Sequence, residues 1–335
     1  MKNAMKRKCA VLLTAVMIPT LAACQNTITE SFDTRLPWID DKAESVVASY
    51  EKLVYSVNIF DTSKGAGDDV RVNIASGELV LELAEQANRR FTDLTSSFTV
   101  TYNGNAAEAD RGLTDTVTSE VTFQTNSLFT STMKKTVALA PREGKTDMSY
   151  TVEADYFEAH KAKKYPVGKP DEAVEMEIPT YGTYHDNEMM FYLARATSLA
   201  AEGSSPFFMT NIFDSFLYGE FTNYTMTASC AKELVTLYMD DWVKDLGVEG
   251  ATTDDGKTVY PVSCYNVSVG ISAEKHGPPY NIQYTEKPFV TGSDEAGDKK
   301  EHNKIPVSMA YPEYTGSTLA RITEYKLTSC AFEKE

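Results

Sequence analysis

Histidines are few in this chain and lie far apart. The four are His160, His185, His276 and His302, and no two stand at the spacing of a metal-binding pair. HExxH, GxSxG and a phosphate-binding glycine loop are all absent. The sequence therefore predicts no metal site and no cofactor, and it singles out no catalytic residue.

The densest group of potential ligands is the run Tyr184-His185-Asp186-Asn187-Glu188. A histidine and carboxylates this close could contribute to a metal site. The same residues also suit the start of a helix, because acidic side chains are stabilising at the positive end of the helix dipole. We favour the helix-capping interpretation.

Two acidic turns and the many carboxylates leave further alternatives open. Residues 61–69 and 293–298 could each surround a calcium ion with oxygen ligands, but neither has the ligand order of an EF-hand, and solvated turns explain both. Among 48 acidic residues, no pair can be selected for glycosidase chemistry without a fold-specific motif.

A cluster of methionines and aromatics lies near the middle of the chain. Flexible methionines adapt to varied apolar shapes, so this cluster could line a cavity for a lipid-like ligand. The alternative is an ordinary helix packed on a sheet. The candidate lining residues are Met189, Met190, Leu193, Phe207 and Phe208.

The first 24 residues have the pattern of an export signal. Four basic side chains precede an apolar run from Ala10 to Ile18, and Leu21-Ala22-Ala23-Cys24 follows. That last run resembles the lipobox of bacterial lipoproteins. The resemblance implies cleavage before Cys24 and attachment of diacylglycerol and palmitate there. An ordinary secreted protein cut nearby is the alternative.

Three cysteines remain after Cys24, and their wide spacing excludes CxxC chemistry. Cys230 and Cys264 both lie in strand-like sequence, so they are the first choice for a disulfide. The favoured alternative is that these two and Cys330 are buried thiols that pack as small apolar groups.

The composition limits the partners. Removal of residues 1–23 takes away four basic and no acidic side chains, which lowers the formal charge from −16 to −20. Such a charge repels nucleic acid, so we expect no nucleic-acid partner. The 42% apolar content can form a real core, which excludes general disorder.

Period-two alternation dominates from Tyr50 onward and predicts strands. Leu53, Tyr55, Val57 and Ile59 begin it, and a Gly- and Asp-rich turn then leads into a second alternating run, as in a hairpin. We expect strands, some of them short, at 50–59, 70–83, 98–102, 117–129 with 136–140 as its continuation, 149–157, 207–213, 220–229, 259–271, 281–285, 305–310 and 319–327.

One segment has helical spacing. Asp186-Asn187 offers an N-cap, and the following apolar residues predict a helix over 187–201. Three prolines in 165–184 predict a crossing loop or linker there, and residues 232–246 fit a helix or a strand. We expect a tether at 24–45 and one β-rich domain at 46–335, with a division into two halves near 165–185 as an option.

The order of elements resembles uncharacterised bacterial lipoproteins with an unclosed curved β-barrel and, distantly, the Lol-type periplasmic lipoprotein carriers. The residues that carry the resemblance are the run 186–195, the strand from Phe207, the run 260–265 and the strand 319–327. It implies a mainly β (α+β) fold, with a long curved antiparallel sheet and one main helix insertion. In the carriers the concave face holds acyl chains.

Together these features predict an exported protein, lipid-anchored at the bacterial cell membrane or cell surface, that binds rather than catalyses. Expected partners are the membrane, through the N-terminal lipid, and an apolar small molecule, a glycan or an envelope protein. The alternative is a hydrolase acting on envelope polymers or glycans.

Overall fold

The computed structural model describes residues 49–63, 71–142, 149–180, 182, 184–196, 204–253, 255–271, 280–292, 297–315 and 318–334. Cys24, the tether, His276 and residues 197–201 of the expected helix lie outside these ranges, as do parts of both acidic turns. No helix within them is long and apolar enough to cross a membrane.

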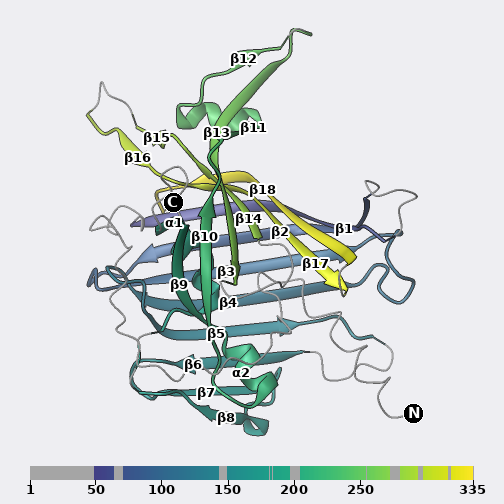
Figure 1. The fold of residues 1–335 in the computed structure, drawn as a ribbon, viewed down its shortest axis with the longest axis vertical. Helices are drawn as coiled ribbons and strands as arrows, with labels where there is room; N and C mark the ends of the chain where they lie inside the picture. The colour runs from purple at the N-terminus through teal and green to yellow at the C-terminus, as the bar shows by residue number, and fades with distance from the viewer. Residues whose placement is uncertain are drawn as a thin grey trace.

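Strands account for most of the described chain (Figure 1). The first group is β1 (Tyr50–Asp61), β2 (Val72–Glu85), β3 (Phe91–Tyr102), β4 (Thr114–Gln124), β5 (Thr130–Ala138), β6 (Tyr150–Asp155), β7 (Lys161–Pro166) and β8 (Val174–Glu177). The second is β9 (Ser204–Thr210), β10 (Asn223–Cys230), β11 (Val235–Met239), β12 (Ala251–Thr252), β13 (Thr258–Ile271), β14 (Tyr280–Thr285), β15 (Phe289–Thr291), β16 (Lys300–His302), β17 (Pro306–Thr315) and β18 (Thr318–Ala331).

Within the described residues, the helical elements are short. The α-helices are α1 (Met190–Ala196) and α2 (Ile212–Tyr218), and the 3-10 turns are η2 (Pro170–Glu172), η3 (Asn187–Met189) and η4 (Asp241–Leu246). The fold is therefore mainly β, as predicted.

Sixteen strands form one antiparallel sheet whose main path runs β8-β7-β6-β5-β4-β3-β2-β1-β18-β17-β14-β13-β10-β9. The first and last strands of the described chain pair with each other, so the free edges, β8 and β9, come from its middle. The sheet curls without closing, and β9 and β10 run across β2–β5 in Figure 1. This confirms the predicted curved, unclosed sheet.

Alternating burial explains why the long strands form. In β1 every second side chain is buried, including Leu53, Tyr55, Val57 and Ile59, while their neighbours are partly exposed. The period of two turns one row of side chains inward and the other outward. The inward rows of strands on both sides of residues 165–185 join in one hydrophobic core.

The chain crosses from one free edge to the other through the interior. After β8, residues 184–196, here called the inner segment, pass between the two edges and are buried along their whole length. Thr130 N–H donates to Tyr184 O at 2.8 Å, and Thr210 N–H donates to His185 O at 2.7 Å. The inner segment thus links β5 to β9 across the opening of the sheet.

Several predicted elements need correction. The expected strand 207–213 ends at Thr210, and α2 begins at Ile212, because Asn211 caps it by accepting a hydrogen bond from Asp214 N–H. Residues 136–140 do not continue the strand that starts at 117. Residues 136–138 end β5, which pairs with β4 after a turn, and residues 139–140 lie beyond it. The expected loop 165–184 contains β8, and the ambiguous run 232–246 divides into β11 and η4.

Candidate functional site

The inner segment begins with the predicted cap. Asp186 Oδ1 accepts a hydrogen bond from Glu188 N–H at 3.0 Å, and Asp186 N–H donates to Thr130 Oγ1 at 2.8 Å. Because the cap satisfies a backbone donor at the helix start, the predicted start of the helix near residue 187 is confirmed.

The Asp186 carboxylate is fully buried and accepts a hydrogen bond from the Tyr156 hydroxyl. Burial and, next, the charge of Glu188 raise its pKa from 3.8 to about 7. Glu188 in turn pairs with Lys135 and accepts from Ser119 Oγ at 3.0 Å. These two carboxylates hold the inner segment against β4, β5 and the end of β6.

His185 is fully enclosed and neutral. Its Nδ1 lies 2.9 Å from Leu128 O, its ring packs 5.0 Å from the Phe129 ring, and burial lowers its pKa to about 4. Within the described residues, no three His, Cys, Asp or Glu side chains are grouped as a metal site would require.

The far end of the inner segment is fixed by a buried ion pair. Arg195 Nη1 donates to both carboxylate oxygens of Glu51 at 2.9 Å, and Nη2 donates to Asn303 O at 2.8 Å. Both charged side chains are at most 3% exposed. The pair connects α1 to β1 across 144 positions of sequence.

The candidate apolar lining residues lie mostly in the packed core. Met189, Met190, Leu193 and Phe207 are at most 1% exposed, whereas Phe208 is partly exposed. The first four contribute to the same core as the strands around them. Their surface is therefore already buried in the folded chain, and ligand binding by them stays a prediction.

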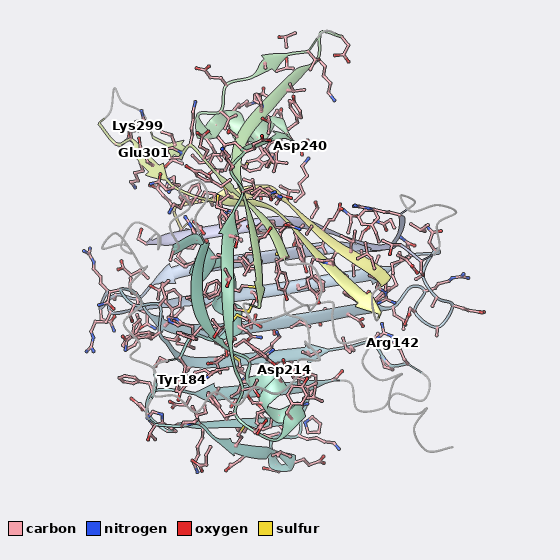
Figure 2. The ribbon with its side chains drawn as sticks, in the orientation of Figure 1. Arg142, Tyr184, Asp214, Asp240, Lys299 and Glu301 are labelled. Carbon is pink, nitrogen blue, oxygen red and sulfur yellow. The ribbon has the colours of Figure 1, made fainter. Side chains whose placement is uncertain are left out.

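A second buried carboxylate site, which sequence reasoning missed, lies on α2 (Figure 2). Asp214 is 0% exposed, and its Oδ2 accepts hydrogen bonds from Asn211 Nδ2 at 2.9 Å and from the Tyr224 hydroxyl at 2.8 Å. Its Oδ1 has no partner among the described residues. Burial raises the pKa of Asp214 to about 6. The signal that could have found it is Asn211 followed three residues later by Asp214, a capping pattern.

Tyrosines from both sides of the curled sheet lie within electrostatic reach of Asp214. Its charge helps to raise the pKa of Tyr280 on β14 and of Tyr150 on β6, although burial is the larger cause for both. The Tyr280 hydroxyl is buried without a partner among the described residues, and its ring stacks on Tyr311 at 4.8 Å.

A lysine covers this region beside α2. The Tyr150 and Phe213 rings stack at 5.2 Å, and Lys164 Nζ lies 4.5 Å and 4.7 Å from their respective centroids. Burial lowers the pKa of Lys164. The contact holds α2 against β6 and β7 where the sheet is open.

The outer face of β4–β8 carries an open groove of about 570 Å³. A ladder of alternating charge crosses it, because Glu120, Lys134, Glu153, Lys163 and Glu175 face one another on successive strands. Lys163 Nζ lies 2.7 Å from Glu153 Oε2, and Lys134 Nζ lies 3.4 Å from Glu153 Oε1. Each of the two lysines lies between two of the three glutamates, so the ladder carries one excess negative charge.

No disulfide joins the cysteines in the part of the chain described. Strand register explains why Cys230 and Cys264 do not meet, since Cys230 faces Val267 and Cys264 faces Val235 on the neighbouring strand. Cys230 and Cys264 are buried thiols, as the favoured alternative predicts, whereas Cys330 is only partly buried.

No protein-family profile matches the chain, and no curated protein is significantly similar to it in sequence. Among solved structures, the chain is similar to a β-barrel-like protein of the domain of unknown function DUF1849 from Brucella abortus. The identity is 11%, the match covers 86% of this chain and 99% of that one, and the TM-score is 0.49.

Proposed function

We propose that this chain is a lipid-anchored protein of the bacterial cell envelope whose folded part binds a ligand and catalyses no reaction. Cys24, at the end of a signal-like leader, would carry the anchor. The unclosed sheet would hold the ligand in its interior, between its two layers of strands.

One observation carries the binding proposal. The interior contains a buried carboxylate oxygen of Asp214, on α2, and a buried hydroxyl of Tyr280, on β14, neither with a partner among the described residues. A buried polar group that lacks a hydrogen bond costs about 1–3 kcal/mol. A molecule that supplies the missing hydrogen-bond partners would recover that free energy. Aromatic side chains of the interior could contact its apolar part.

The hydrolase alternative has less support. A glycosidase needs two carboxyl groups that flank the substrate in an open cleft. The closely spaced pair Asp186 and Glu188 is instead enclosed in the core and held by Tyr156, Lys135 and Ser119.

Native mass spectrometry tests the proposal. The protein is purified from its host without added ligand, the lipid anchor is removed, and the intact mass is compared before and after denaturation. We expect a stoichiometric non-covalent mass that denaturation releases. A bare polypeptide mass in protein that remains folded would contradict ligand binding.

A further inference from the structure

The free edge at β8 presents backbone hydrogen-bonding groups. β8 pairs with β7 on one side, and no described strand pairs with its other side (Figure 1). Just beyond β8, Ile178 N–H donates to His160 O at 2.8 Å and so points toward the β7 side. Backbone groups alternate in direction along an antiparallel strand. The N–H and C=O groups of Glu175 and Glu177 therefore point away from β7, toward the open edge.

Charge on the outer face of the sheet also ends at this edge. Lys163 faces Glu175 and Lys161 faces Glu177, and Lys161 Nζ lies 3.5 Å from Glu177 Oε1. Both glutamates are exposed. Opposite charges on directly opposed residues stabilise paired strands. A basic side chain beyond each glutamate would therefore continue the alternation of charge across the sheet.

The other face of β8 is apolar and incompletely covered. Met176 lies opposite the buried Ala162 and is itself partly exposed, and Val174 is 65% exposed. Successive side chains of a strand point to opposite faces. An added strand would thus place an apolar residue opposite Met176, between the two basic residues and on the other face. The edge fits the pattern basic, apolar, basic.

The two free edges of the sheet differ in what they admit. β9 contains Pro206, which has no backbone N–H, and Thr210 at its end forms a bridge to Asp186 of the inner segment. β8 contains no proline. Its glutamates instead disfavour a second copy, because antiparallel pairing of two β8 strands would place like charges opposite each other.

We propose that β8 binds an extended segment of another protein, added as an antiparallel strand, with basic side chains at two alternate positions and an apolar residue between them. Main-chain hydrogen bonds to Glu175 and Glu177 supply affinity, and the two carboxylates select the basic residues and fix the register. This surface lies at the edge of the sheet and goes beyond the proposed ligand in the interior. Either partner can be absent while the other binds.

Fluorescence anisotropy with labelled hexapeptides tests this on the folded full-length protein. The probe is Thr-Lys-Val-Lys-Val-Thr with blocked ends. Thr-Glu-Val-Glu-Val-Thr reverses its charge, and Thr-Lys-Lys-Val-Val-Thr keeps its composition and charge but loses the alternation. We expect saturable binding of the probe, about tenfold tighter than that of either control. Equal affinity for the two lysine peptides would show only general attraction to an acidic protein and would overturn the proposal.

Methylation of the peptide backbone tests the strand pairing itself. In the antiparallel register, the lysine N–H groups donate to β8 and the valine N–H groups point away. N-methylation of both lysines should therefore abolish binding, whereas N-methylation of both valines should change it little. Equal losses, or a larger loss for the methylated valines, would overturn the antiparallel pairing.

Charge reversal of the protein locates the binding. The double variant Glu175→Lys with Glu177→Lys should prefer the glutamate peptide over the lysine probe. Glu78→Lys with Glu249→Lys changes two exposed residues elsewhere by the same net charge and should keep the preference of the parent. The same preference in both double variants would contradict the site at β8.

Two further outcomes are decisive. If the β8 variant does not fold, the methylated peptides still decide the matter on the parent protein. Sedimentation equilibrium identifies a competing occupant of the edge. A parent dimer that the β8 variant does not form, together with no peptide binding, would make a second copy the occupant and overturn the proposal.

Discussion

Buried charges fix the inner segment at three points. Asp186 and Glu188 anchor its start, and Arg195 anchors its end on Glu51. Each contact joins residues far apart in sequence, so none has a local signature. Sequence reasoning could predict that Asp186 caps a helix, because a cap involves only neighbouring residues. It could not predict the partners that the fold brings to these charges.

Breaking the Glu51–Arg195 pair should strongly destabilise the protein. Glu51→Gln leaves the guanidinium buried without its counter-charge, and we expect a loss of about 3–5 kcal/mol in the free energy of unfolding. Urea denaturation measures it. The double variant Glu51→Leu with Arg195→Met removes both charges and should lose less than Glu51→Gln alone. If the double variant loses as much free energy of unfolding as Glu51→Gln or more, the unpaired guanidinium is not the cause of the destabilisation.

The raised pKa of Asp186 predicts a pH dependence. The folded protein holds a proton on Asp186 up to a pKa of about 7, while the ordinary value is 3.8. Between these values the folded state binds more protons than the unfolded state. The protonated Asp186 therefore contributes its full amount to the free energy of unfolding at low pH. This stabilisation is lost as pH rises between the two pKa values, by at most about 1.4 kcal/mol per pH unit.

Urea denaturation from pH 4 to 8, a range chosen around the ordinary value of 3.8 and the raised pKa of about 7, checks this sign. Asp186→Asn cannot titrate, so its stability should fall less with rising pH than that of the parent. Part of the decline should remain, because burial raises the pKa of Asp214 in the same direction. Asp171→Asn, an exposed control, should follow the parent. Identical slopes for the parent and Asp186→Asn would contradict the buried, protonated carboxyl.

At the scale of elements, long strands were predictable and short edge elements were not. Alternating burial in β1 matches the apolar pattern of its sequence, because one face of the strand meets the core. β8 has three exposed residues out of four and therefore carries no such pattern. The sequence of α2 is an aromatic run that fits a strand equally well, and the local signals of a helix are its cap at Asn211 and the left-handed Gly219 at its end.

Strand packing at Gly77 provides a sharp test of the sheet. A Cβ at this position in β2 would lie 1.8 Å from Thr99 O on β3, so the strands would have to separate. We expect Gly77→Ala to cost about 1–3 kcal/mol. Gly104→Ala is the matched control, since a Cβ there would meet no atom within 4 Å, and its stability should stay within about 0.5 kcal/mol of the parent. Equal denaturation midpoints for both variants would contradict the β2–β3 packing.

At the scale of the whole molecule, the pairing of β1 with β18 determines where the sheet opens. It places the free edges at β8 and β9, and the chain between these edges supplies the inner segment. The sequence suggested a curved sheet with a helix near its middle, because strand patterns flank a proline-rich connection. It could not give the strand order, which depends on contacts between residues more than 250 positions apart.

The lipid anchor is a prediction about the whole molecule in its host. Cys24→Ser removes the sulfur that would carry the lipid, so the protein should move from the membrane fraction to the soluble envelope fraction. Immunoblotting of fractions from cells expressing the parent and the variant measures this. Cys330→Ser, a change within the folded part, should stay in the membrane fraction as the parent does. A Cys24→Ser protein that stays membrane-bound would place the anchor elsewhere.

The central claim is that the interior beside Asp214 holds a ligand. A crystal structure of protein purified from its host, at a resolution that defines ordered water, tests this most directly. We predict density larger than a water molecule within hydrogen-bonding distance of Asp214 Oδ1 and the Tyr280 hydroxyl, which are two of the buried groups that have no partner among the described residues. Ordered water alone, or direct contact between these two groups, would contradict the claim.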